Sequence, residues 1–88
     1  MDIQDAAVYV GTYGKYNEGS LDGAWLYIAD YPTKADFYAA ARKLHKDERE
    51  PEYMFQDWQN IPVGMINESS ISDELFELVR ELSNMDPE

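Results

Sequence analysis

The sequence contains no cysteine, one histidine and no long apolar run. The lack of cysteine excludes a disulfide framework and a thiolate metal site, and a single imidazole excludes a metal site with two histidines. Because there is neither a charged and apolar leader nor an apolar stretch long enough for a membrane span, we expect a cytoplasmic protein with no export signal. No residue pattern predicts a metal or another cofactor.

Positive charge is also scarce, since seven basic side chains stand against eighteen acidic ones and the net charge is −11. The acids are concentrated outside one basic stretch, because residues 33–46 carry a net charge of +3 and residues 47–88 a net charge of −10. Such a balance is repelled by nucleic acid and by anionic membranes, and it is attracted to basic protein surfaces. We therefore expect a protein partner, with no direct nucleic acid binding and no membrane binding.

Apolar residues are abundant enough for one core. They make up 44% of the 88 residues, a share that argues against wholesale disorder despite the charge. A chain of this length supports one core and not two. We expect residues 1–88 to form a single domain, with a sheet and a helix in residues 7–59 and a loop and C-terminal helix in residues 60–88.

Three strands are expected. Alternating side chains predict strands at residues 7–13 and 23–29, the second with Trp25 and Tyr27 on one face. Residues 14–22 join them as a loop longer than the usual hairpin connection of about 2–5 residues, and long loops often carry function. The aromatic segment 53–58, bounded by turn residues, predicts a third strand.

Two helices are expected after the hairpin. Thr33 and Asp36 have the spacing of a capping box, and an apolar stripe follows them. Ser72 caps a second helix from Asp73 to about Asn84. One side of that helix is acidic, with Asp73, Glu74, Glu77 and Glu81. This band is either a solvated face or a row of carboxylates offered to a basic partner.

No catalytic constellation is visible, so we expect a protein that is not an enzyme. His45, beside lysines at the expected C-terminus of the first helix, is typical of a capping or surface group. The acids between Asp47 and Glu52 lack the glycine and the spacing of an EF-hand. The segment Gly11–Lys15 lacks the glycine spacing of a phosphate-binding loop. Asp57 fits a hydrogen-bonded structural aspartate better than a perturbed acid.

Two stretches of the chain carry a family resemblance. They are YVGTYGKYNEGSLDGAWL and AARKLHKDEREPEYMFQDWQNIP, and with their spacing they resemble the N-terminal half of the ArdA antirestriction family from about Val8 to Ile71. That family consists of DNA-mimicking proteins from mobile elements that inhibit type I restriction-modification enzymes. Familiar members are longer and have a further acidic C-terminal region that contributes to dimerisation, so the resemblance implies a possible homodimer.

The resemblance and the residue patterns together predict an α+β fold. It comprises a small three-stranded antiparallel sheet with one packed helix and long loops, followed by a C-terminal acidic helix. A compact domain of this size is about 30 Å across, a length over which duplex DNA carries about eighteen phosphates. The carboxylates expected to imitate phosphates toward the methyltransferase core are those of Asp22, Asp30, Asp47, Glu48, Glu50, Glu52, Asp57, Asp73, Glu74, Glu77 and Glu81.

An alternative function belongs to a different class. The chain could be a protein-protein interaction or regulatory module of a mobile element, with its acidity serving only solubility. In that case the partner contacts would come from exposed aromatic side chains, and the candidates are Tyr13, Tyr16, Tyr31 and Trp58. Duplex DNA discriminates between the two hypotheses, because it competes with a DNA mimic for its partner and not with such a module.

Overall fold

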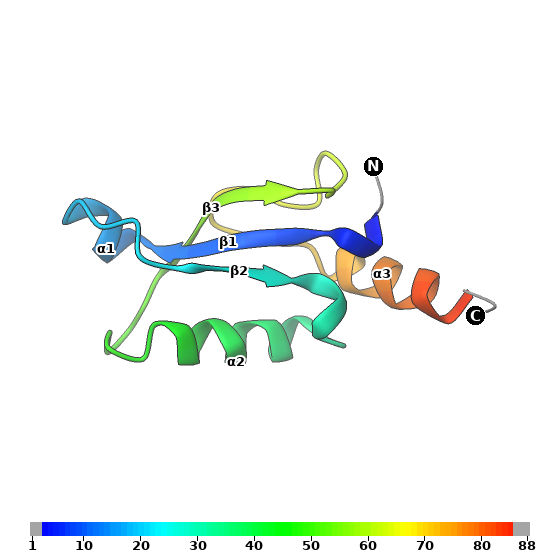
Figure 1. Cartoon of the computed structure of the whole chain (residues 1–88), viewed down its shortest axis with the longest axis horizontal. Helices are drawn as coiled ribbons and strands as arrows, with labels where there is room; N and C mark the ends of the chain where they lie inside the picture. Colours follow the sequence, from blue (N-terminus) through cyan, green and yellow to red (C-terminus); the bar gives the residue numbers. More distant parts are fainter. Residues whose placement is uncertain (1–2, 86–88) are drawn as a thin grey trace.

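The computed structural model describes residues 3–85, and side chains as far as residue 82. Its centre is a three-stranded antiparallel sheet with the strand order β2-β1-β3 (Figure 1). The strands are β1 Ala7–Thr12, β2 Ala24–Tyr27 and β3 Tyr53–Gln59. The α+β fold and all three expected strands are thereby confirmed.

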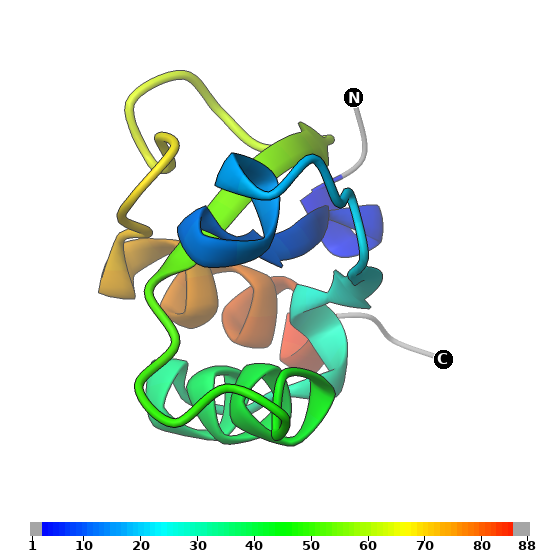
Figure 2. The same ribbon diagram turned by 90° about the vertical axis from the view of Figure 1, so that its left-hand side faces the viewer.

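Both long helices lie on the same side of the sheet, as the view along the molecule shows (Figure 2). They are α2 Lys34–Leu44 and α3 Asp73–Met85. A short helix, α1 Tyr13–Asn17, follows β1, and two 3₁₀ turns, η1 Ile3–Asp5 and η2 Ile28–Asp30, precede β1 and follow β2. No helix among the described residues has the length and apolar character needed to cross a bilayer.

The caps expected for the long helices are present. The Thr33 hydroxyl accepts a hydrogen bond from the backbone N–H of Asp36 at 3.2 Å, and that of Ser72 accepts one from the N–H of Glu74 at 3.1 Å. Each bond satisfies one of the N–H groups that the first turn of a helix leaves unpaired. The predicted starts of both helices are therefore correct.

The segment between the first two strands is not simply a loop, as the sequence had suggested. Thr12 caps the helix α1 by accepting a hydrogen bond from the backbone N–H of Lys15 at 3.1 Å. The second strand is also shorter than expected, because its end turns into η2, where the N–H of Tyr31 donates to the carbonyl of Ile28 at 3.0 Å. Both differences bend the backbone at the ends of the strands.

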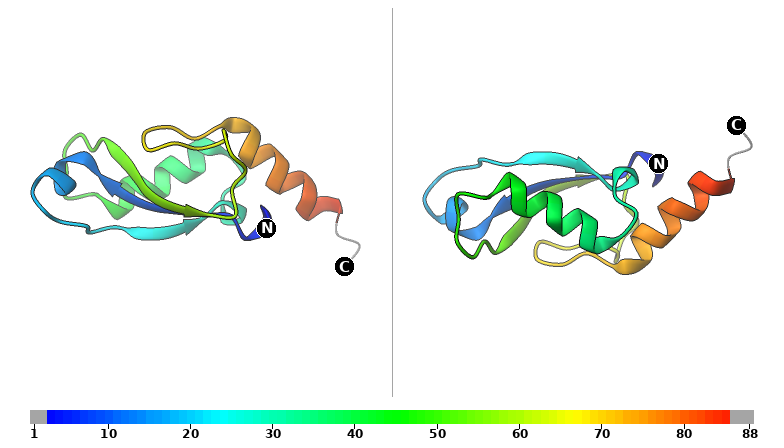
Figure 3. Two further views of the ribbon diagram at one scale, coloured as in Figure 1. Left: turned by 90° about the horizontal axis from the view of Figure 1, so that it is seen from above. Right: turned by 90° about the horizontal axis from the view of Figure 1, so that it is seen from below.

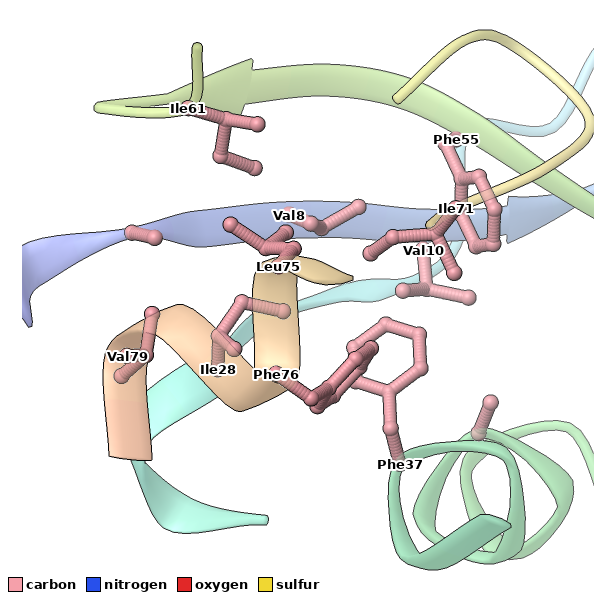
Figure 4. Close-up of a cluster of buried hydrophobic side chains, with 12 residues drawn as sticks. Val8, Val10, Ile28, Phe37, Phe55, Ile61, Ile71, Leu75, Phe76 and Val79 are labelled. Atoms are coloured by element: carbon pink, nitrogen blue, oxygen red, sulfur yellow. The ribbon is translucent and has the colours of Figure 1, made fainter. Parts of the chain in front are cut away.

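One buried cluster joins the sheet to both long helices (Figure 4). Phe37 of α2 is its centre, with ring centroids 6.1 Å from Phe55 of β3 and 5.6 Å from Phe76 of α3. Burying a side chain of this kind stabilises the fold by about 1.5–3 kcal/mol. Leu75 and Val79 extend the buried side of α3, so the opposite, acidic side of that helix is held in a fixed position.

The sheet face away from the helices is partly open. Tyr9 and Trp25 form an edge-to-face pair with ring centroids 5.6 Å apart, and Tyr27 is 51% exposed. A bulge interrupts β3, because the pairing with β1 shifts between Tyr9 and Val10 and leaves Gln56 without a partner residue. The Gln56 side chain therefore crosses the open face.

The molecule is elongated, with extents of 46 × 22 × 18 Å (Figure 3). The expected diameter of about 30 Å was therefore wrong. The sheet is narrow because it has only three strands, and α3 packs against η1 and η2 at one end instead of lying across its middle. Length along one axis is the property on which a comparison with duplex DNA depends.

Candidate functional site

Ten of the eleven acidic side chains expected to imitate phosphates fall into two groups toward opposite ends of the long axis. All are exposed except Glu48, which is half-buried. One group, here called the acidic end, lies around α1 and the connection from α2 to β3 (Figure 1) and consists of Asp22, Asp47, Glu48, Glu50 and Glu52. The other, here called the α3 band, consists of Asp73, Glu74, Glu77 and Glu81, with Asp30 nearby on η2, which packs against α3.

Lys15 lies at the centre of the acidic end. Its side chain is only 11% exposed, and its ammonium nitrogen is 3.0 Å from Asp47 Oδ1, 3.5 Å from Asp22 Oδ2 and 4.0 Å from Glu48 Oε2. Burial alone would lower the pKa of Lys15, but the hydrogen bond to Asp47 and the charges of Asp47 and Asp22 raise it above its usual value. Three of the predicted phosphate mimics are therefore held by a cation of the same chain.

The pKa of Asp47 shifts in the opposite direction from that of Lys15. The hydrogen bond that it accepts from Lys15 holds the pKa of its carboxyl below the usual value. Glu48 has a further partner, since the Thr12 hydroxyl donates to its Oε2 at 2.5 Å. These contacts brace the acidic end against α1 and fix the positions of its carboxylates.

His45 belongs to the same network and is completely buried. The expectation of a capping group is partly correct, because His45 is the C-cap residue of α2, but a surface position was wrong. Its Nε2 is 3.0 Å from the carbonyl of Val10 and its Nδ1 is 2.9 Å from the ammonium of Lys15. Since a carbonyl only accepts and an ammonium only donates, a neutral ring with its proton on Nε2 satisfies both contacts. The ring is thus a structural link between β1 and α1.

The α3 band is less neutralised than the acidic end. Asp73 is 3.7 Å from the ammonium of Lys34, whereas Glu74, Glu77 and Glu81 form no ion pair among the described residues. Arg80, which borders the band, donates from Nη1 to the carbonyl of Pro32 at 2.6 Å. The guanidinium is therefore directed to the backbone that precedes α2, and the outward carboxylates of α3 remain available.

Asp57 stands apart from both groups on β3. Its carboxylate is exposed, and its Oδ1 accepts a hydrogen bond from the backbone N–H of Trp58 at 2.8 Å. This contact agrees with the expectation of a hydrogen-bonded structural aspartate.

The four aromatic candidates do not form one surface. Tyr31 is half-buried and packs edge-to-face on Phe37, with ring centroids 5.8 Å apart. Tyr13 donates from its hydroxyl to Glu68 Oε1 at 2.9 Å, and this hydrogen bond, together with burial and the carboxylate charge, raises the pKa of Tyr13. Tyr16 and Trp58 are 49% and 37% exposed.

Tyr16 and Trp58 do share a pocket on the molecular surface. The pocket has a volume of about 390 Å³ and lies between α1, β3 and the loop that follows β3. We call it the Trp58 pocket, and its lining residues are Tyr16, Leu21, Met54, Phe55, Gln56, Trp58 and Glu68. It combines exposed aromatic side chains with the carboxylate of Glu68 in one hollow.

Sequence reasoning missed Lys15, Gln56 and Glu68 as parts of these sites. Lys15 was considered only as part of a phosphate-binding loop, and nothing in the sequence indicates that it meets Asp22, Asp47 and Glu48. Nothing in the sequence marks the bulge that turns Gln56 into the pocket lining. Within the described residues, no group of three or more potential ligands is placed to hold a metal ion.

Comparison with known proteins gives one family match. The family model described as Antirestriction protein (ArdA) matches residues 8–88. Nothing matches the chain among the curated proteins or among the solved structures. The matched range includes β1 from Val8 onward and all of β2, β3, α1, α2 and α3, and therefore every carboxylate of the acidic end and of the α3 band.

Proposed function

We propose that this chain, which belongs to the ArdA family of antirestriction proteins, inhibits type I restriction-modification enzymes by occupying the cleft that binds DNA. Its exposed carboxylates engage lysine and arginine side chains of the methyltransferase core that otherwise hold DNA phosphates. The inhibition takes place in the cytoplasm and requires no chemical step, because the chain and DNA exclude each other from one site.

The observation that carries this proposal is the presence of carboxylates at both ends of a molecule 46 Å long. Duplex DNA of that length comprises about 13 base pairs and carries about 27 phosphates. The molecule is thus longer than one helical turn of about 34 Å. An acidic surface of this extent matches a cleft that binds more than one turn of duplex.

The acidic end and the α3 band contribute unequally to the proposed binding. Lys15 offsets part of the charge of the acidic end, whereas Glu74, Glu77 and Glu81 of the α3 band face solvent. A partially neutralised carboxylate attracts a distant lysine less than a free one does. We therefore assign the larger share of the binding free energy to the α3 band.

The test is binding of the purified chain to the methyltransferase core of a type I enzyme, with and without competing duplex DNA, across a salt series. Binding is expected to weaken as the salt concentration rises and to be abolished by duplex DNA. The variant Glu74→Gln with Glu77→Gln is expected to bind about tenfold more weakly at low salt, since two exposed ion pairs contribute about 0.7 kcal/mol each.

A matched control removes the same number of charges elsewhere. Asp5→Asn with Glu18→Gln removes two other exposed charges, one on η1 and one at the end of α1, and is expected to bind within about threefold of the unmodified chain. Equal losses in the two double variants would show that only net charge matters and would contradict the assignment to α3. Binding that duplex DNA does not disturb would refute mimicry and favour an interaction module.

A further inference from the structure

The Trp58 pocket is an open hollow on the surface, large enough for a long amino-acid side chain together with adjacent backbone. Its volume of about 390 Å³ lies near the lower end of the range of about 300–1,000 Å³ that ligand pockets cover. Tyr16 comes from α1 and Trp58 from β3, and the lining is completed by the apolar side chains of Leu21 and Met54. Exposed aromatic rings in a hollow are the surroundings in which single anchoring side chains of a partner bind.

Glu68 gives the pocket its charge. Its Oε1 accepts a hydrogen bond from Tyr13, and its backbone carbonyl accepts one from the N–H of Phe55 at 2.8 Å. The side chain of Asn67 organises the turn that follows, because its Oδ1 accepts from the backbone N–H of Ser70 at 2.8 Å. Glu68 is therefore held in place by β3 and by its own turn, and it forms no ion pair within the part of the chain that the structure describes.

Gln56 also lines the pocket, with its amide nitrogen turned away from solvent. Its Nε2 is buried and has no hydrogen-bond partner among the described residues. A buried donor that lacks a partner costs about 1–3 kcal/mol. The amide nitrogen lies against Gly11 of β1, so Gln56 shapes the lining of the pocket and does not supply an accessible donor.

We propose that the Trp58 pocket binds an arginine side chain of a basic partner protein. A guanidinium stacks on aromatic rings and pairs with a carboxylate through parallel N–H groups, and both partners are present here. The charge of the whole chain, −11, favours the approach of such a partner. The identity of the partner rests on the proposed function, whereas the chemistry of the pocket does not.

The pocket is tested with the full chain and a short peptide, without any enzyme. The probe is the blocked tripeptide Gly-Arg-Gly, followed by NMR at the indole N–H of Trp58 and the side-chain amide of Gln56. Both signals are expected to shift to saturation, and Glu68→Gln is expected to weaken binding about fivefold. This substitution retains an oxygen that accepts from Tyr13, so the turn remains intact.

Three controls separate a built site from general attraction to an acidic protein. The same peptide with citrulline, which is neutral, is expected to cause no saturable shift, and one with lysine to bind more weakly than arginine. Glu18→Gln removes one exposed charge outside the pocket and is expected to leave the affinity unchanged within about twofold. Equal binding of the lysine peptide, or equal losses in the two variants, would overturn the proposal.

A second experiment asks whether the pocket is used against the restriction enzyme. Inhibition by Glu68→Gln is expected to be weaker than inhibition by Glu18→Gln, because only the former removes a contact to an arginine. Equal inhibition would overturn the role of the pocket as an anchor while leaving DNA mimicry intact. If the unmodified chain does not bind the enzyme, the proposed function fails, and the peptide titration still decides the chemistry of the pocket.

Discussion

Lys15 places one ammonium group within 4.0 Å of three carboxylates and 2.9 Å from a histidine nitrogen. We predict that Lys15→Met destabilises the fold by about 1–3 kcal/mol, mainly because the buried Nδ1 of His45 loses its donor. Urea unfolding of the unmodified chain and of Lys15→Met measures the difference in the free energy of unfolding. Lys43→Met, which changes an exposed lysine of α2, serves as the control and is expected to change stability by less than about 0.5 kcal/mol.

The difference in stability between the unmodified chain and Lys15→Met depends on pH with a defined sign. The pKa of Asp47 is lowered in the folded state, so its contribution is complete above its ordinary value of 3.8 and is lost as the pH falls through the folded value. The pKa of Lys15 is raised, so its contribution is complete below 10.5 and is lost as the pH rises through the folded value. The stability difference should therefore shrink at both extremes. A difference that grows in acid would contradict the pairing.

The Gln56 side chain lies directly over Gly11 of β1. A Cβ at position 11 would collide with Nε2 of the Gln56 side chain. Because this atom is the far end of a flexible side chain and has no hydrogen-bond partner among the described residues, it can move aside, and we predict that Gly11→Ala destabilises the fold by at most about 1 kcal/mol. Gln56→Ala removes the obstacle, so the double variant should recover most of that loss in a double-mutant cycle of unfolding free energies. Additive losses would show that Gly11 is required for another reason.

At the scale of elements, local patterns predicted what local interactions determine. The helix α2 carries an apolar stripe and a capping threonine at Thr33, and α3 repeats this arrangement with Ser72. The helix α1 could not be predicted in this way, because its five residues include Gly14 and Asn17, which are poor helix formers, and show no apolar stripe. Its contacts come from Asp47 and other residues about thirty positions away.

The candidate site also has parts that local patterns predict and parts that depend on contacts distant in the sequence. Exposure of the acids on α3 followed from the helical period, since residues opposite a buried stripe face solvent. The neutralisation of Asp22 and Asp47 by Lys15 did not follow, because a run of like charges does not indicate which member meets a distant lysine. The Trp58 pocket was equally hidden, since it depends on a bulge at Gln56 that the pairing of β3 with β1 creates.

The dependence of α1 on its cap can be tested. Thr12 is completely buried, accepts from the N–H of Lys15 and donates to Glu48. Thr12→Val keeps the shape of the side chain but loses both hydrogen bonds, so we predict a destabilisation of about 1–3 kcal/mol. Amide exchange at Lys15 should accelerate more than exchange in α2. Thr12→Ser keeps the hydroxyl and should lose less; uniform acceleration in both helices would argue against a local role.

At the scale of the whole molecule, charge density distinguishes the chain from the duplex that it would imitate. Along its 46 Å it carries one acidic residue per about 2.6 Å and one net charge per about 4 Å, compared with one phosphate per about 1.7 Å of duplex. Duplex DNA of 46 Å carries about 27 phosphates, so the eighteen acidic residues of the longer molecule are fewer than the phosphates of a duplex of equal length. The surface of the chain therefore carries negative charge at a lower linear density than duplex DNA does.

This lower charge density predicts that binding of the chain depends less steeply on salt concentration than binding of duplex DNA does. Binding of DNA releases the counterions condensed on phosphates, which makes log K fall with log salt concentration at about 0.9 per phosphate neutralised. A chain with fewer and partly neutralised charges holds fewer such ions.

On one methyltransferase core, the slope for this chain should therefore be shallower than that for a duplex of about 13 base pairs, and a larger share of its affinity should persist at high salt. Glu74→Gln with Glu77→Gln should flatten the slope further. An equal or steeper slope for the unmodified chain would mean that its carboxylates attract counterions as densely as phosphates do, which the spacing of charges along 46 Å argues against.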